Sequence, residues 1–245
     1  MNNKEKQQDD FISTISHELR TPLTSIRGFA QTMINSWDKL DDENKKKFVE
    51  IIEQQSNRLI NLVENMLSVK KLQSFKDKLI FKNVNANELL EPIVQIVKHQ
   101  YPNHNFEIDI NPKIPNILVD IDKFQQIMLN LIENAAKYSN EGTKICIKTD
   151  FSCCSDFISI KIIDEGIGIK EEDFEKIFTK FSRLDNPLTR KAQGSGLGLY
   201  ITKTLVNKMN GKIFVKSSEN GSIFEVFFPV ENIENQAKKI FKGCD

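Results

Sequence analysis

The stretch FISTISHELRTPLTSIRGFAQTM, residues 11–33, carries apolar side chains at alternating spacings of three and four residues. Residues 48–69 repeat this spacing, which is typical of helices that pack along a single seam. The sequence therefore predicts two long helices. The first seam is Ile12, Ile15, Leu19, Pro22, Ile26, Phe29 and Met33, and the second is Phe48, Ile52, Gln55, Leu59, Leu62, Met66 and Val69.

The polar segment 36–42 joins these helices and is too short for anything but a tight reversal. We expect an antiparallel hairpin in which Asp41 or Asp42 caps the second helix. Because each helix carries a full apolar seam, the hairpin cannot bury both faces by itself. The sequence therefore predicts a homodimer that forms a four-helix bundle.

Pro22 lies inside the first predicted helix, directly after Thr21. Proline removes one backbone hydrogen bond and kinks a helix. We expect a bend at this turn, which is either a functional hinge or a harmless kink.

His17 occupies the heptad position farthest from the seam, so we expect an exposed imidazole. Glu18 is adjacent and Thr21 lies four residues on, so carboxylate, hydroxyl and imidazole can approach one surface. An exposed imidazole is partly unprotonated near neutral pH and is then nucleophilic. Glu18 could hold the proton of its second nitrogen, although a surface histidine alone is common and predicts little.

From Leu79 onward the pattern changes to short apolar runs that alternate with helical segments, which predicts a mixed α/β domain. The Asn220-Gly221 pair predicts a hairpin between the last two runs, and Asn210-Gly211 predicts a helix end. The polar tail after Pro229 is expected to fray. The predicted strands are 144–151, 157–163, 212–217 and 222–230, and the predicted helices are 86–98, 122–138 and 199–209.

The composition is that of an ordinary globular protein, with 39% hydrophobic and 28% charged residues among 245. Lysine plus arginine equal aspartate plus glutamate at 34 each, so the net charge suggests neither a nucleic-acid nor a membrane partner. We find no apolar run of about 18 residues and no signal peptide. A soluble, cytoplasmic chain without membrane contact is expected.

The cysteines and the remaining histidines predict no metal site. The four cysteines lack zinc spacing, and the adjacent Cys153 and Cys154 cannot easily close an unstrained disulfide. We expect reduced thiols without a role. His99 and His104 lie in a polar stretch, and we expect both to be exposed.

Three downstream motifs carry the groups that a nucleotide site needs. Asn130, Asn134 and Lys137 share one face of the predicted helix 122–138, which suits a metal-bridged triphosphate, although such a face is often merely solvated. Asp164 ends an apolar strand, where a carboxylate can accept a hydrogen bond from an exocyclic amino group. Gly166 and Gly168 then let the backbone approach a ring closely.

The third motif is glycine-rich and precedes a predicted helix. Gly194, Gly196 and Gly198 can therefore bring backbone amides and a helix N-terminus to phosphate oxygens. The polar segment 185–193 predicts a mobile lid. The motif is neither a Walker loop nor a dinucleotide fingerprint, because no Gly-Lys-Ser/Thr follows and no strand directly precedes it.

With these motifs in order, residues 5–231 resemble the cytoplasmic catalytic core of a sensor histidine kinase of bacterial two-component systems. Five family boxes have counterparts here: the H box around His17, the N box at Asn130–Tyr138, the G1 box at Asp164–Gly168, the F box at Phe178–Phe181 and the G2 box at Gly194–Leu199. The resemblance implies an α+β chain, in which a helical hairpin that dimerises into a four-helix bundle precedes an α/β sandwich ATP-binding domain. The implied boundaries are 1–76, 77–231 and a flexible tail at 232–245.

The same resemblance implies roles for individual residues. His17 would accept the phosphoryl group, Glu18 would act as base, and Thr21 would orient water when the kinase dephosphorylates its partner. Asn134 would bind Mg²⁺, Asp164 would bind adenine, and Arg183 would approach the γ-phosphate of ATP. The other implied nucleotide-binding residues are Asn130, Lys137, Tyr138, Gly166, Gly168, Gly194, Gly196, Leu197 and Gly198.

The predicted function is therefore ATP-dependent autophosphorylation of His17, followed by transfer to an aspartate in the receiver domain of a response regulator. Two alternatives remain: a chaperone-like ATPase and a dimeric, nucleotide-gated scaffold without catalysis. The sequence contains no evident sensor domain. We expect the signal to arrive through a separate protein, unless the chain is a fragment of a longer one.

Overall fold

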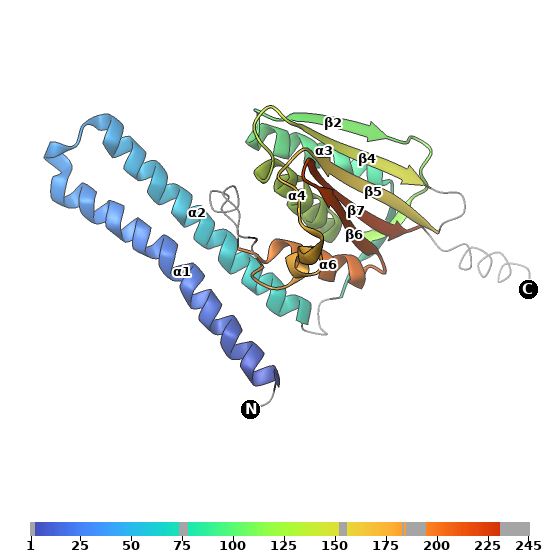
Figure 1. Ribbon diagram of the computed structural model, residues 1–245, viewed down its shortest axis with the longest axis horizontal. Helices are drawn as coiled ribbons and strands as arrows, with labels where there is room; N and C mark the ends of the chain where they lie inside the picture. Colours follow the sequence, from blue (N-terminus) through green and yellow to red (C-terminus); the bar gives the residue numbers. More distant parts are fainter. Residues whose placement is uncertain (1–2, 74–77, 152–155, 183, 185–194, 231–245) are drawn as a thin grey trace, which may run out of the picture.

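The computed structural model describes residues 3–73, 78–151, 156–182, 184 and 195–230. A pair of long helices is followed by a layered α/β domain (Figure 1). Helix α2 (Asp42–Gln73) lies beside the α/β domain, whereas α1 (Asn3–Ser36) lies on the far side of α2. The predicted fold class is confirmed.

The two helices run antiparallel and are joined by a short 3-10 turn, η1 (Trp37–Lys39). Of the two candidate caps, Asp41 caps α2, because its Oδ1 accepts a hydrogen bond from the backbone N–H of Asn44 at 2.7 Å. Helix α1 continues through Pro22 as a single helix, so the proline does not end it. The predicted hairpin is therefore confirmed.

The seam between α1 and α2 is buried only in part. The rings of Phe29 and Phe48 meet with centroids 5.1 Å apart, and Leu62 and Val69 are fully buried. Several large apolar side chains remain exposed on these helices, so the pair presents an apolar face that it cannot cover by itself. They are Leu23, Ile34, Val49, Ile60, Val63 and Leu67.

The α/β domain is built on a five-stranded sheet with the order β2-β4-β5-β7-β6. Strand β2 is parallel to β4, and the remaining neighbours are antiparallel. The strands are β2 (Asn105–Ile110), β4 (Lys144–Phe151), β5 (Phe157–Asp164), β6 (Lys212–Ser218) and β7 (Gly221–Pro229).

Three helices cover one face of this sheet, the face turned toward α2 (Figure 1). They are α3 (Ala86–Gln100), α4 (Ile121–Lys137) and α6 (Gly198–Lys208). The apolar stripe of α4 is fully buried, and its Phe124 packs on Phe228 of β7 with ring centroids 5.3 Å apart. The opposite face of the sheet carries ion pairs such as Lys148–Asp109 at 2.8 Å. One face therefore forms the core and the other meets water.

All four predicted strands and all three predicted helices of this domain are present, with ends shifted by at most two residues. The sequence analysis missed β2 and a small second sheet, in which β1 (Phe81–Val84) pairs with β3 (Ile117–Asp120). Two short 3-10 turns, η2 (Glu171–Asp173) and η3 (Lys176–Phe178), were also missed. The alternation of Phe106, Ile108 and Ile110 with charged residues could have indicated β2, whereas the other missed elements have only three or four residues, too few for a periodic signal.

The prediction for His104 was wrong, since its side chain is 7% exposed and lies between the rings of Tyr101 and Phe106. His99 is exposed as predicted. Cys146 is a free, partly buried thiol. The other three cysteines and the tail 231–245 lie outside the described residues.

Candidate functional site

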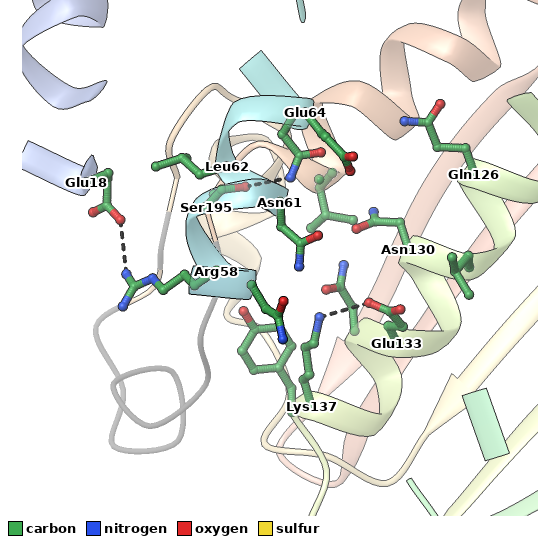
Figure 2. Close-up of a pocket in the computed structure, with 18 of the residues that line it drawn as sticks. Glu18, Arg58, Asn61, Leu62, Glu64, Gln126, Asn130, Glu133, Lys137 and Ser195 are labelled. Atoms are coloured by element: carbon green, nitrogen blue, oxygen red, sulfur yellow. Dashed lines mark hydrogen bonds and ion pairs between the residues drawn. The ribbon is translucent and has the colours of Figure 1, made fainter. Parts of the chain in front are cut away.

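A cavity of about 750 Å³ lies between α2 and the α/β domain. Both regions contribute polar side chains to its walls (Figure 2). Because these side chains come from segments far apart in the sequence, the cavity exists only where the two regions meet. The helix pair contributes Glu18, Gln54, Asn57, Arg58, Asn61, Leu62, Glu64 and Asn65, and the α/β domain contributes chiefly Tyr101, Asn130, Glu133, Asn134, Lys137, Tyr138, Ser195, Gly196, Gly198 and Leu199.

Helix α4 presents Asn130, Asn134 and Lys137 to this cavity, so the structure brings together the three residues that the sequence placed on one face. Asn130 also donates from Nδ2 to Oγ1 of Thr202 on α6 at 2.9 Å. A Cβ on Gly198 would collide with the Asn130 amide, so a larger residue there would force this cavity-lining side chain to shift.

Lys137 is the cation at the end of this face, and its ammonium lies 3.0 Å from Oε2 of Glu133. Burial alone would lower the pKa of Lys137, but the negative charge of Glu133 and the neighbouring Tyr101 raise it above its ordinary value. Lys137 therefore stays protonated and available to an anion.

A narrower apolar slot opens beside the cavity, between α4 and the sheet. Its walls include Tyr138, Ile169 and Phe224, and Asp164 lies among them at only 7% exposure. Burial raises the pKa of Asp164 to about 6, against the lowering effect of hydrogen bonds from the N–H groups of Gly166 and Ser222. At neutral pH this carboxylate is mostly ionised and can accept a hydrogen bond from an amino group.

Gly168 also lines the slot and has a φ of +67°, in the left-handed region. A Cβ there would collide with the backbone of Ser218, so only glycine fits. Gly166 packs beside Tyr138 and Asp164, Gly196 lines the cavity, and Leu197 is fully buried before α6. Arg183, Gly194 and the predicted lid at 185–193 lie outside the described residues.

Near His17, the structure adds a partner that the sequence analysis missed. Glu18 faces α2, where its Oε2 accepts a hydrogen bond from Nη2 of Arg58 at 3.3 Å (Figure 2). His17 is exposed, and its carbonyl accepts a 3.4 Å hydrogen bond from the hydroxyl of Thr21. Arg58 lies 40 residues from Glu18, and only the hairpin register could have indicated this pair.

A direct hydrogen bond joins the two regions at the glycine-rich turn. Nδ2 of Asn65 on α2 donates to Oγ of Ser195 at 3.3 Å, and the same oxygen accepts from the N–H of Leu197. The start of α6 is thereby tied to the helix pair.

Within the described ranges, no group of three or more His, Cys, Asp or Glu side chains could hold a metal ion. Among the helices described, none is long and apolar enough to cross a membrane.

Two family models match the chain in the order of its two regions. Residues 7–75 match the His Kinase A (phospho-acceptor) domain, and residues 119–232 match the histidine kinase-, DNA gyrase B- and HSP90-like ATPase. This chain belongs to the histidine kinase family. The N-terminal helix pair of this histidine kinase is thus its phospho-acceptor domain, and the domain that contributes α4 and α6 to the cavity is its ATPase-like domain.

Curated relatives support the assignment along nearly the whole kinase core. ArlS, a signal transduction histidine-protein kinase of Staphylococcus haemolyticus, is 34% identical over 91% of this chain and 49% of its own length. The non-motile and phage-resistance protein of Caulobacter vibrioides is 28% identical over 96% of this chain and 29% of its own. The chain therefore spans less than half the length of these two relatives.

Solved structures of other histidine kinases share the fold. Histidine kinase ThkA, solved in complex with the response regulator protein TrrA, has a TM-score of 0.74 and 26% identity, covering 94% of this chain and 64% of that one. Full-length ShkA, solved in complex with AMPPNP, has a TM-score of 0.66 and 25% identity, covering 91% of this chain and 46% of that one.

Proposed function

We propose that this chain binds ATP, phosphorylates itself on His17 and passes the phosphoryl group to an aspartate of a response-regulator receiver domain. The observation that carries the proposal is the cavity, which has the α4 face of Asn130, Asn134 and Lys137 on one wall and Glu18, the neighbour of His17, on the other. Its relatives support the same activity, since ThkA was solved with a response regulator and ShkA with an ATP analogue.

The nucleotide is proposed to lie with its adenine in the apolar slot and its phosphates in the polar cavity. Asp164 would accept a hydrogen bond from the exocyclic amino group, and the walls of the slot would enclose the ring. The triphosphate would then point toward Asn134 and Lys137 and toward the N-terminus of α6, where backbone N–H groups favour anions.

Mg²⁺ fits the donors in this cavity, because the Asn134 amide oxygen and the Glu133 carboxylate both line it and oxygen ligands suit this ion. Asn134 would hold the ion against the phosphates. When bound, Mg²⁺ neutralises part of the phosphate charge.

In the transfer step, an imidazole nitrogen of His17 attacks the γ-phosphorus. An N–P bond forms, the bond from the γ-phosphorus to the bridging oxygen breaks, and ADP leaves. The proton on the second imidazole nitrogen is held by Glu18, which must turn from Arg58 to reach it. His17 lies outside the described cavity lining, so the ATP-binding domain must move along the helix pair before transfer. The protein supplies mainly orientation and charge neutralisation.

Dimerisation through the helix pair belongs to the same proposal, since a second copy would cover the exposed apolar face of α1 and α2. The domains are proposed to meet near residue 76. We also propose that the kinase acts in the cytoplasm on signals from a separate sensor or from segments beyond this chain.

Thr21 is exposed one turn after His17, where its hydroxyl could orient a water that dephosphorylates the regulator. Replacing Thr21 by Ala should leave autophosphorylation unchanged and slow regulator dephosphorylation about tenfold or more, the scale of one positioned polar group. Both rates are measured with purified phosphorylated regulator. Equal loss of the two activities would contradict this role.

Doubly labelled ATP tests the proposed function against its rivals. The γ-phosphate label should appear on the protein, whereas an α-phosphate label should not. A chaperone-like ATPase would release labelled phosphate without labelling the protein, and a scaffold would do neither.

A further inference from the structure

Arg58 on α2 lines the cavity although it lies outside every motif in the sequence. It reaches across the helix pair to α1, where its Nη2 donates to Oε2 of Glu18 at 3.3 Å (Figure 2). Both side chains are partly buried, with 21% of Arg58 and 26% of Glu18 exposed. Water and salt screen such a pair less than one on the open surface. Arg58 is therefore a positioned cation in the wall of the cavity.

The register of the helix pair keeps Arg58 level with the turn that carries His17. Glu18, the partner of Arg58, directly follows His17 in the sequence. Further along the hairpin, the ring contact between Phe29 and Phe48 fixes the same antiparallel register. A movement of the α/β domain along the helix pair would therefore leave Arg58 beside the turn of His17.

Positive charge is scarce in the described part of the cavity. Among the described residues of its lining, the cations are Arg58 and Lys137, and the acids are Glu18, Glu64 and Glu133. Lys137 lies 3.0 Å from its partner Glu133, so each of these two cations already has a carboxylate beside it. An incoming triphosphate, which is strongly anionic, therefore competes with carboxylates for the cations of this lining.

The proposed transfer step empties the place beside Arg58. Glu18 must turn from Arg58 toward His17 to hold the imidazole proton, which would leave a partly buried guanidinium without its anion. An unpaired charge in such a place is costly, so another anion should replace the carboxylate. We propose that Arg58 is a catalytic residue that binds the γ-phosphoryl group of ATP when Glu18 leaves it. The planar fork of an arginine suits two phosphoryl oxygens.

The exchange of anions at Arg58 couples the nucleotide to the base. ADP lacks the γ-phosphate, so only ATP displaces Glu18 from Arg58 and frees it for His17. During transfer the guanidinium offsets negative charge on the phosphoryl group, and no bond to Arg58 forms or breaks. The inference rests on the proposed function, because it needs ATP in the cavity and His17 as the acceptor. It goes further by naming the residue that distinguishes ATP from ADP.

Calorimetry of the whole chain with Mg²⁺ and either ATP or ADP tests the exchange, in a His17→Gln background that prevents transfer to this residue. Glu18→Gln removes the carboxylate that competes for Arg58. ATP should then bind about tenfold more tightly, as for a hydrogen bond to a charged group, and ADP affinity should stay unchanged. Adding Arg58→Gln should abolish this gain. No gain for ATP, an equal gain for ADP, or a gain that persists in Arg58→Gln would each overturn the inference.

Autophosphorylation rates with His17 intact provide a second test. Arg58→Gln should lower kcat about a hundredfold, the usual cost of removing one donor to a developing charge. KM for ATP should stay nearly unchanged, because Arg58 is paired with Glu18 before transfer. Arg58→Lys keeps the charge but loses the fork, so it should recover part of the rate. If Arg58 served only to restrain Glu18, Arg58→Gln would raise kcat, and that result would contradict a catalytic role.

Arg27→Gln is the matched control, since Arg27 is an exposed arginine on α1 that lies outside the described cavity lining. It should change neither kcat nor the two affinities. The fluorescence of Trp37 reports whether Arg58→Gln unfolds the helix pair, in which case a smaller loss of kcat in Arg58→Lys at constant KM decides the test. If wild type bound ATP and was never labelled, the proposed function would fall, whereas the ATP and ADP affinities would still test Arg58.

Discussion

Two aromatic pairs of nearly equal geometry lie in the two regions of this kinase. Phe29 and Phe48 pack between α1 and α2 with centroids 5.1 Å apart, and Phe124 and Phe228 pack between α4 and β7 at 5.3 Å. The second pair is completely buried, whereas both members of the first pair remain partly exposed. The contact is the same in both regions, and the surroundings differ.

The difference indicates that the α/β domain encloses its main core within one chain, whereas the helix pair leaves more of its apolar surface exposed. Helices from one side and a sheet from the other enclose the Phe124 ring. In the helix pair, by contrast, large apolar side chains such as Ile34, Ile60 and Leu67 remain exposed. The cavity between the regions therefore joins a domain with an enclosed core to a helix pair whose exposed apolar face the proposed second copy would cover.

The largest expected effect is a difference in the free energy of unfolding between alanine variants of the two aromatic pairs. Phe124→Ala should lower the free energy of unfolding of the α/β domain by about 3–5 kcal/mol, because it leaves a closed cavity. Phe48→Ala, its matched control, should cost clearly less at concentrations where the chain is monomeric. The three tyrosines all lie in the α/β domain and the single tryptophan, Trp37, lies in the helix pair, so their fluorescence follows the two regions separately. Equal losses would contradict the comparison.

The next effect concerns association. Leu67→Glu places a charge on the exposed apolar face of α2, and it should weaken the dimer by about 2–3 kcal/mol, since the charge would be buried without a partner. Sedimentation at several concentrations measures the change. Ile96→Glu alters an equally exposed apolar residue on α3 and should leave the dimer intact. A dimer that tolerates Leu67→Glu would place the interface elsewhere.

The smallest expected effect is a pH dependence of adenosine binding to the α/β domain. Adenosine should bind about tenfold more weakly at pH 5 than at neutral pH, because Asp164 titrates at about 6 and accepts the amino hydrogen bond only when ionised. Adenosine avoids the titration of the phosphates. Asp164→Asn should bind adenosine weakly, with an affinity that does not vary between pH 5 and neutral pH. If this variant kept the pH dependence of the wild type, Asp164 would not be the group that binds the amino group.

Asp164 also contributes to the stability of the fold, with a pH dependence opposite to that of adenosine binding. Burial raises the folded-state pKa of Asp164 above its ordinary value of 3.8, so the folded protein binds the proton more tightly than the unfolded chain does. This contribution is fully present below pH 3.8 and is lost as the pH rises through about 6. As the pH falls through about 6, protonation of Asp164 should therefore weaken adenosine binding and add to the free energy of unfolding.

Long periodic segments and glycine positions carried most of what could be predicted. The seams of α1 and α2 and the apolar stripe of α4 are properties of local sequence, so the helices and the shared face of Asn130, Asn134 and Lys137 followed from spacing. Asn220-Gly221 likewise placed the β6–β7 hairpin. These features depend on residues near one another in the chain.

The contacts that escaped prediction depend on tertiary packing. The Glu18–Arg58 pair requires the register of two helices, and Tyr101 lines the same cavity as Lys137 because α3 packs on α4. His104 lies in a polar stretch and is nevertheless buried, since rings on both sides enclose it. Strands β1 and β3 are four residues each, too short for a periodic signal.

ATP bound by the α/β domain is proposed to phosphorylate His17 on the helix pair. The most direct measurement incubates wild type, His17→Gln and His99→Gln with γ-labelled ATP and Mg²⁺, and then tests the label for stability to acid and base. His99 is an exposed histidine on α3 and serves as the control. We predict acid-labile, base-stable label on wild type and His99→Gln and none on His17→Gln. Label that persists in His17→Gln, or wild type that binds ATP without becoming labelled, would contradict the account.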